Sequence, residues 1–188
     1  MFQANPEKVI LFFGDSLTAG YGLSPEEAFP ALIEKSLIKN GQKVKVVNAG
    51  LSGETTAGGL ARIDWILRQP MDIFVLELGG NDGLRGLPID QSRKNLQTII
   101  DKVKSKYPSC KIVLAGMMVP PNMGKEYATS FQSIFKDIAK KNNAVLIPFL
   151  LEGVGGIERL NQADGIHPNV EGHKIVAAHL TKILSTLL

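Results

Sequence analysis

The chain is poor in several residues that often carry function. Its 188 residues include one cysteine, one tryptophan and three histidines. A single cysteine excludes a disulfide within the chain, so we expect the hydrophobic core alone to hold the fold. Cys110 stands just before the apolar run IVLA. A small, half-buried residue entering a strand is the simpler interpretation of it, and a catalytic thiol is the alternative.

Long hydrophobic runs and clusters of one charge are also missing. No stretch approaches the ~20 apolar residues of a membrane span, so we expect no stable membrane insertion. The N-terminal MFQANPEKVILFF is unlike a secretory signal, because polar residues precede a short apolar run. The 21 Lys and Arg residues are scattered and form no stripe interleaved with aromatics, so nucleic acid is not an expected partner. Oligomeric state stays open, as does the compartment: cytoplasmic, or periplasmic or secreted for a processed form.

What the chain does have is a regular alternation of apolar runs with segments of helical period. The apolar runs lie at 9–13, 44–48, 73–78, 112–115 and 144–147. The helical segments are 25–40, 56–68, 92–106, 129–142 and a last one from Asn169 onward, after Pro168. Strands alternating with helices predict an α/β fold, a three-layer α/β/α sandwich with a five-stranded parallel sheet. No linker or repeat interrupts the pattern, so we expect a single domain over 1–188.

Nearly all of the unusual composition falls in the loops that follow the expected strands. Right-handed crossovers place these loops at one edge of a parallel sheet, where open α/β sheets bind ligands. The loops are 14–22, 48–59, 79–86, 116–124 and 149–168. Turn chemistry alone accounts for their glycines, but it does not select a serine, an asparagine and a histidine.

The three histidines do not form a zinc site. His173 and His179 lie six residues apart on the last helical segment, a rotation of about 120° per step from His167, so they cannot converge on one ion. We therefore expect no metal, and His173 and His179 to lie on the helix surface or in a groove. His167 differs, because Asp164 precedes it by three residues in a turn. Asp164 could orient the imidazole as a general base, or it could cap the turn while His167 is incidental.

Ser16 follows the first apolar run in the stretch GDSL. A hydroxyl becomes a nucleophile only when a base takes its proton, and otherwise Ser16 only ends a strand and starts a helix. The order Ser, Asp, His is that of α/β-hydrolases, but their G-x-S-x-G motif is absent. Acyl transfer also needs donors to the oxyanion, for which the Gly53 backbone and the Asn81 side chain are candidates, unless both serve only their loops.

Four sequence blocks, in order over nearly the full chain, resemble the SGNH (GDSL) hydrolases. They are GDSLTAGYG with Ser16, NAGLSGET with Gly53, LELGGNDGLRG with Asn81, and DGIHPNVEGH with Asp164 and His167. The chain is most similar to the bacterial thioesterase I, lysophospholipase and arylesterase group. The resemblance implies a flavodoxin-like sheet, a Ser16–His167–Asp164 triad, and an oxyanion hole made by the Ser16 amide, the Gly53 amide and Asn81.

The activity implied by the resemblance is that of a serine esterase without metal or cofactor. Its small-molecule substrates would be aryl or acyl esters, thioesters or lysophospholipids, cleaved through an acyl-enzyme on Ser16. The residues after the fourth strand offer a flexible apolar wall for an acyl chain, or they only fill the core. These residues are Met117, Met118, Val119, Pro120 and Met123. These residues do not predict which acyl-chain length the enzyme prefers.

Other functions on the same sheet are a carbohydrate acetyl esterase and a flavodoxin-like binding or receiver module. The lone Trp65, expected on a helix, argues mildly against an aromatic platform for sugars. A receiver needs clustered acids after the first strand, an acceptor aspartate after the third and a lysine after the fifth. The chain has Asp15 alone, Asp82 beside Asn81, and no lysine in PFLLEG.

Overall fold

The computed structural model describes residues 6–188 and contains one five-stranded parallel sheet. The strands are β1 (Lys8–Gly14), β2 (Val44–Gly50), β3 (Ile73–Glu77), β4 (Lys111–Ala115) and β5 (Val145–Ile147). Their order, β2-β1-β3-β4-β5, is the flavodoxin-like one and confirms the predicted fold class. Residues 1–5, part of the segment compared with a secretory signal, lie outside the described residues.

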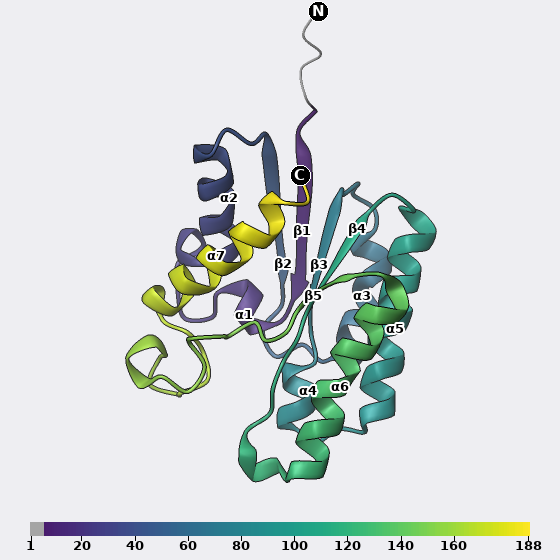
Figure 1. Cartoon of the computed structure of the whole chain (residues 1–188), viewed down its shortest axis with the longest axis vertical. Coiled ribbons are helices and arrows are strands. Elements are labelled where there is room, and N and C mark those ends of the chain that lie inside the picture. Colours follow the sequence, from purple (N-terminus) through teal and green to yellow (C-terminus); the bar gives the residue numbers. More distant parts are fainter. Residues whose placement is uncertain (1–5) are drawn as a thin grey trace, which may run out of the picture.

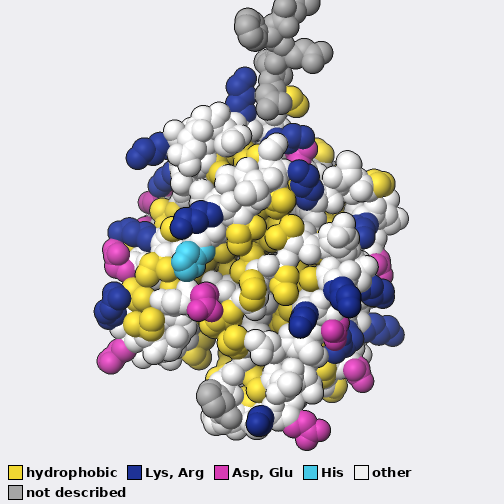
Figure 2. Space-filling model, in the orientation of Figure 1, with side chains coloured by type: hydrophobic (Ala, Val, Ile, Leu, Met, Phe, Trp, Pro, Cys, Tyr) yellow, Lys and Arg dark blue, Asp and Glu magenta, His cyan; other side chains and the backbone are white. Residues whose placement is uncertain are grey.

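Helices cover both faces of the sheet (Figure 1). On one face lie α2 (Phe29–Lys39) and α7 (Val170–Ser185), and on the other α3 (Thr56–Ile66), α5 (Ile89–Lys106) and α6 (Lys125–Asn142). Short helices complete the chain: α1 (Ser16–Ala19), α4 (Gly80–Leu84), and the 3₁₀ turns η1 (Pro25–Glu27), η2 (Pro121–Met123) and η3 (Glu158–Leu160). In the same view, Figure 2 shows hydrophobic side chains gathered between α7 and the opposite helical layer, with charged side chains around them.

Strand β1 lies at the centre of this arrangement. It pairs with β2 on one side and with β3 on the other, and its residues Ile10–Phe13 are fully buried. The chain leaves β1 toward β2 and later returns to β3 on the opposite side. The crevice between the carboxyl ends of β1 and β3 is therefore the topological switch point, where such sheets bind ligands.

The helix boundaries differ from the predicted ones for local reasons. The segment 25–40 is two elements, η1 and α2, separated by Ala28 in an extended conformation. Pro30 causes the break, because proline is tolerated in the first turn of a helix but not in its interior. Helices α5 and α6 begin a few residues earlier than expected. The short helices α1 and α4 were expected as loops, since four or five residues show no helical period.

His173 lies in the groove between α7 and α2, where it is buried, while His179 is exposed. Its Nδ1 accepts a hydrogen bond of 3.0 Å from the backbone N–H of Phe29, and its ring stacks on that of Phe29. Phe29 is the first residue of α2, so this N–H has no partner inside its own helix. Burial lowers the pKa of His173 to about 4. The neutral imidazole thus caps α2 and joins it to α7.

We expect His173 to make the protein less stable as the pH falls. The unfolded histidine protonates near pH 6.5 and the folded one only near pH 4, so the unfolded state binds more protons between these values. Between pH 7 and pH 4 the loss is about 3 kcal/mol. His173→Asn keeps an acceptor at the δ position but does not titrate. Urea unfolding of both proteins across this range should show a steeper decline for the wild type, and parallel curves would contradict the assignment.

Candidate active site

Ser16 is placed at the switch point by the end of β1. The strand ends at Gly14, Asp15 is the N-cap of α1, and Ser16 is the first residue of that helix. A Cβ at Gly14 would overlap the Thr18 hydroxyl and the Glu77 carboxyl group, so only glycine permits this close turn. The turn brings the Ser16 hydroxyl to the carboxyl edge of the sheet.

The hydroxyl of Ser16 meets a histidine from the other end of the chain. Ser16 Oγ lies 2.9 Å from His167 Nε2, and His167 Nδ1 lies 2.7 Å from Asp164 Oδ2. Asp164 Oδ1 also accepts the backbone N–H groups of Ile166 and His167 at 2.9 and 3.0 Å. These bonds lower the pKa of Asp164 to about 2. The backbone N–H of His167 contributes most to this shift, and the His167 ring contributes next. One Asp164 oxygen therefore caps the turn, and the other faces the imidazole.

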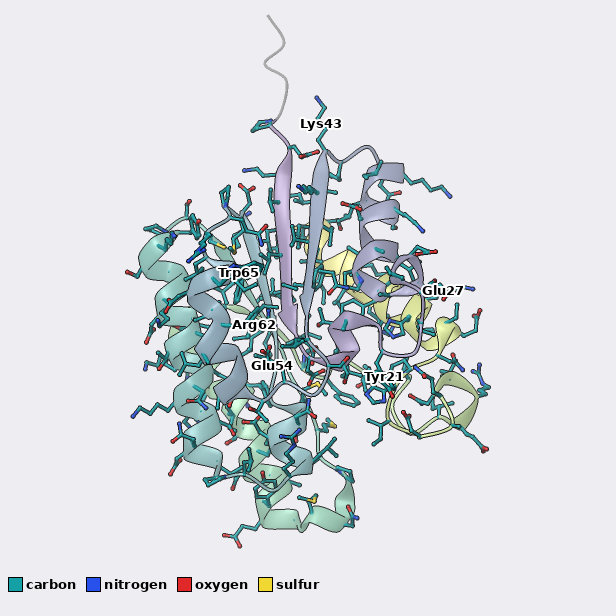
Figure 3. The ribbon with its side chains drawn as sticks, turned by 180° about the vertical axis from the view of Figure 1, so that it is seen from behind. Tyr21, Glu27, Lys43, Glu54, Arg62 and Trp65 are labelled. Carbon is teal, nitrogen blue, oxygen red and sulfur yellow. The ribbon has the colours of Figure 1, made fainter. Side chains whose placement is uncertain are left out.

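Two residues that received no role from the sequence hold His167 in place. The Tyr21 ring packs on the His167 ring with centroids 4.7 Å apart. The Gln162 side chain donates to the backbone oxygens of Tyr21 and Pro168 at 2.7 and 3.0 Å. Figure 3 shows Tyr21 beside the loop that leads into α7. Tyr21 belongs to the block GDSLTAGYG, but its contact with His167 arises only from the tertiary fold.

Hydrogen bonds of Asn81 connect the expected oxyanion donors to one another. Asn81, on α4, donates through Nδ2 to Asp15 Oδ2 and to the backbone oxygen of Glu54, both at 3.0 Å. Gly53 precedes Glu54 and has a φ of +79°, a conformation that favours glycine. The structure thus joins Asn81 both to the residue before Ser16 and to the loop that carries Gly53. Because both Nδ2 hydrogens of Asn81 are engaged, a substrate oxygen would have to share or displace one of these contacts.

A cleft of about 490 Å³ opens beside Ser16 and His167. Of the five residues expected to form an apolar wall, four line it: Met117, Met118, Val119 and Pro120. Met123 lies in η2 and is not among the described lining residues. Further apolar side chains come from elements that the sequence did not connect with the wall: Leu84, Phe149, Leu151 and Ile166. The cleft is therefore an apolar hollow with a few polar groups at one end.

Two buried carboxyl groups lie beneath the nucleophile. Glu77 is completely buried, and its Oε2 accepts from the Asp15 N–H at 3.2 Å and from the Thr18 hydroxyl at 2.7 Å. Its Oε1 has no hydrogen-bond partner among the described residues. Burial, and next the nearby Asp15, raises the pKa of Glu77 well above its ordinary value. Burial raises the pKa of Asp15 to about 6, against the opposing hydrogen bonds from Leu17 and Asn81. Of these two carboxyl groups, Glu77 is therefore the one that burial most strongly favours in its protonated form.

Three residues considered for other functions, Asp82, Cys110 and Trp65, lie away from the cleft. Asp82 is buried and accepts hydrogen bonds from the Thr56 N–H at 2.8 Å and the Ser92 hydroxyl at 3.0 Å, so it anchors α3 instead of facing the cleft. Cys110 is buried, which raises the pKa of its thiol to about 11 and keeps it protonated at pH 7. Trp65 is exposed on α3, away from the residues that line the cleft.

Neither a metal centre nor a membrane span emerges from the described part of the chain. Within residues 6–188, no group of three or more His, Cys, Asp or Glu side chains is placed to hold a metal ion. In the same range, no helix combines the length and the apolar character needed to cross a bilayer.

The raised pKa of Glu77 can be tested with Glu77→Gln. In the folded wild type the pKa of Glu77 is raised above its ordinary value of 4.5. The contribution of this carboxyl group to stability is therefore full below pH 4.5 and is lost as the pH rises toward the folded pKa. Glutamine resembles the protonated carboxyl and does not titrate. Urea unfolding at pH 5 and pH 8 should show that Glu77→Gln gains stability relative to the wild type as the pH rises. The exposed Glu152→Gln is the matched control, and an equal pH response of both variants would contradict the inference.

Comparison with known proteins agrees with this geometry. Residues 12–175 match the GDSL-like lipase/acylhydrolase family. Esterase TesA of Pseudomonas aeruginosa is 38% identical over 187 residues, which cover 99% of this chain and 92% of that protein. Thioesterase 1/protease 1/lysophospholipase L1 of Escherichia coli strain K12 is 38% identical over 188 residues, covering 100% and 88%.

The fold comparison gives the same result. The crystal structure of the psychrotrophic esterase EstA from Pseudoalteromonas sp. superposes with a TM-score of 0.90 at 32% identity, covering 96% of this chain and 98% of that one. The family match covers most of the chain, the relatives have similar lengths and the fold is shared. These three findings indicate the same family. The chain belongs to the GDSL-like lipase/acylhydrolase family, the SGNH hydrolases, and is an ester-hydrolysing enzyme of that family.

Proposed function

We propose that the protein hydrolyses carboxylic esters through an acyl-enzyme on Ser16. The observation that carries the proposal is the chain of contacts from Ser16 Oγ through His167 to Asp164, at 2.9 and 2.7 Å. In this arrangement His167 Nε2 takes the proton as Ser16 attacks the carbonyl carbon, while the Asp164 anion stabilises the imidazolium that forms. Every group that the reaction requires belongs to the chain itself.

The second half of the reaction uses the same residues. His167 returns its proton to the leaving alcohol or thiol, which leaves the acyl group on Ser16. Water then enters, His167 removes its proton, and attack on the acyl-enzyme releases the acid and restores the Ser16 hydroxyl. Because the pKa of Asp164 is lowered to about 2, its carboxylate is ionised throughout the pH range in which esterases are assayed.

We assign the oxyanion hole to the backbone amides of Ser16 and Gly53 and to the side chain of Asn81. Ser16 occupies the first turn of α1, where backbone N–H groups have no partner within the helix. Asn81 is tied to Asp15, the residue before Ser16, which supports its placement beside the reacting carbonyl. Donors of this kind supply a large share of the rate enhancement in acyl transfer.

The substrate class that we propose is small acyl or aryl esters, with thioesters and lysophospholipids as further candidates. The apolar cleft of about 490 Å³ suits an acyl chain or an aromatic leaving group. Related proteins carry the names esterase TesA and thioesterase 1/protease 1/lysophospholipase L1, which supports the same range. We further propose that the chain acts as a single domain, because one hydrophobic core joins the sheet to the helices on both faces.

Hydrolysis of p-nitrophenyl esters of graded chain length tests the proposed function. We expect turnover by the wild type and a loss of about 10³-fold or more in kcat for Ser16→Ala and for His167→Ala, since each member of a triad is needed for nucleophilic attack. His179→Ala is the matched control, because His179 is exposed on α7 and far along the helix from the triad. The proposal fails if the wild type shows no turnover, or if Ser16→Ala retains most of it.

The acyl-binding role of the cleft wall has its own test. Met118 is half exposed at the cleft, and Met118→Trp would narrow the hollow without opening a cavity in the core. We expect the ratio of kcat/KM for octanoyl over acetyl p-nitrophenyl esters to fall about tenfold. Met123→Trp, outside the cleft, should leave the ratio unchanged. Equal ratios for the two variants would show that Met118 does not contact the acyl chain.

A further inference from the structure

The loop between β2 and α3 is clamped by a residue that the mechanism above does not use. Arg62, on α3, reaches back to Glu54 and makes a two-pronged ion pair: its Nε and Nη2 each lie 2.6 Å from a different carboxylate oxygen. The Glu54 side chain is only 3% exposed, and that of Arg62 is 23% exposed. Figure 3 shows the two side chains facing each other at the carboxyl end of the sheet. A surface ion pair contributes little, but this carboxylate has almost no access to water and depends on its partner.

The same guanidinium also holds the ends of two strands. Its Nη2 donates to the backbone oxygen of Ala49, near the end of β2, at 2.7 Å, and lies 3.5 Å from the backbone oxygen of Gly14, the last residue of β1. Its plane lies over the buried Phe13 ring, with Cζ 4.2 Å from the ring centroid. Arg62 therefore touches the strand that leads into Ser16 and the strand that leads into the Gly53 loop.

Glu54 connects this clamp to the proposed oxyanion hole. It directly follows Gly53, and its backbone oxygen accepts the hydrogen bond from Asn81 Nδ2 at 3.0 Å. Displacement of Glu54 would therefore move the Gly53 peptide and release one of the two contacts that orient the Asn81 amide. The other end of the loop is fixed independently, since Asp82 binds the Thr56 N–H at the start of α3. Arg62 thus acts on residues 51–55, the segment between the end of β2 and the start of α3.

We propose that Arg62 is a positioning residue for ester hydrolysis, which sets the Gly53 amide and the Asn81 side chain relative to Ser16 through its ion pair with Glu54. This inference rests on the proposed function. Oxyanion donors must lie within a narrow range of distances from the developing charge, so small displacements act on the chemical step more than on binding. A lysine cannot reproduce the arrangement, because it lacks the planar fork that meets two carboxylate oxygens and a carbonyl at once.

The test compares Arg62→Ala and Arg62→Lys with the matched control Arg68→Ala. Arg68 is exposed just beyond the end of α3, so it controls for loss of a positive charge in the same region. The wild type and Ser16→Ala are measured in the same series, with p-nitrophenyl butyrate as substrate. Thermal unfolding by circular dichroism establishes that each variant is folded at the assay temperature. Guanidinium chloride at millimolar concentration is then added to Arg62→Ala to refill the vacated site.

We expect Arg62→Ala to lose about 10- to 100-fold in kcat while KM changes less than about threefold. Arg62→Lys should be similarly impaired, Arg68→Ala should match the wild type, and guanidinium should restore kcat severalfold in Arg62→Ala only. A kcat for folded Arg62→Ala within about twofold of the wild type, or a loss confined to KM, would overturn the proposal. An absence of rescue by guanidinium would also overturn the proposal. It would indicate that Arg62→Ala loses activity through a general loss of stability, which added guanidinium does not restore.

Two further measurements separate the possible failures. If Arg62→Ala does not fold, Glu54→Gln is measured in its place. Glutamine keeps the shape of the glutamate side chain and removes the charge that Arg62 binds. A kcat of Glu54→Gln equal to that of the wild type would then overturn the proposal. If the wild type does not hydrolyse the ester, or Ser16→Ala still does, the proposed function fails instead. The positioning role of Arg62 is rejected only when the wild type is active and Ser16→Ala is not.

Discussion

The complete burial of Ile10–Phe13 in β1 is the constraint on which the rest of the structure depends. Hydrogen-bonded to β2 and β3 and covered by helices on both faces, Ile10–Phe13 cannot shift without exposing the core. The strand ends at Gly14, where the Thr18 hydroxyl and the Glu77 carboxyl leave no room for a side chain. Ser16 is therefore positioned at the switch point by the buried end of β1. The remaining site residues are arranged around that point by the loops that follow the neighbouring strands.

The two halves of the candidate site are held by different kinds of interaction. Ser16 and Asn81 belong to short helices near the buried carboxyl groups of Glu77 and Asp15, which accept hydrogen bonds from the backbone and from side chains. His167 and Asp164 lie in a more exposed loop, which is fastened by Gln162 and by the ring of Tyr21. Reactive geometry at 2.9 Å between Ser16 and His167 results where the two halves meet.

Much of this arrangement could be predicted from local patterns. The five apolar runs identified the strands, and Pro25 and Asn169 stand at helix starts as expected. Local patterns did not decide the positions that depend on contacts between distant segments. The burial of His173 depends on α2 lying against α7, and the position of Met123 outside the cleft depends on the turn of η2. Pro30 was visible in the sequence, but the helical period around it concealed the break that it causes.

The residue types and their order along the chain already define the chemistry that this protein can perform. A serine, a histidine, an aspartate and an asparagine follow strands of a parallel sheet, and that topology sends such loops to one edge. The raised pKa of Glu77, the stacking of Tyr21 on His167 and the ion pair of Arg62 with Glu54 arise only when the chain is folded. Each depends on excluding water or on contacts a few ångströms long between residues from separate elements. Neither the exclusion of water nor contacts between separate elements can be read from a local segment, so only the packed tertiary structure determines them.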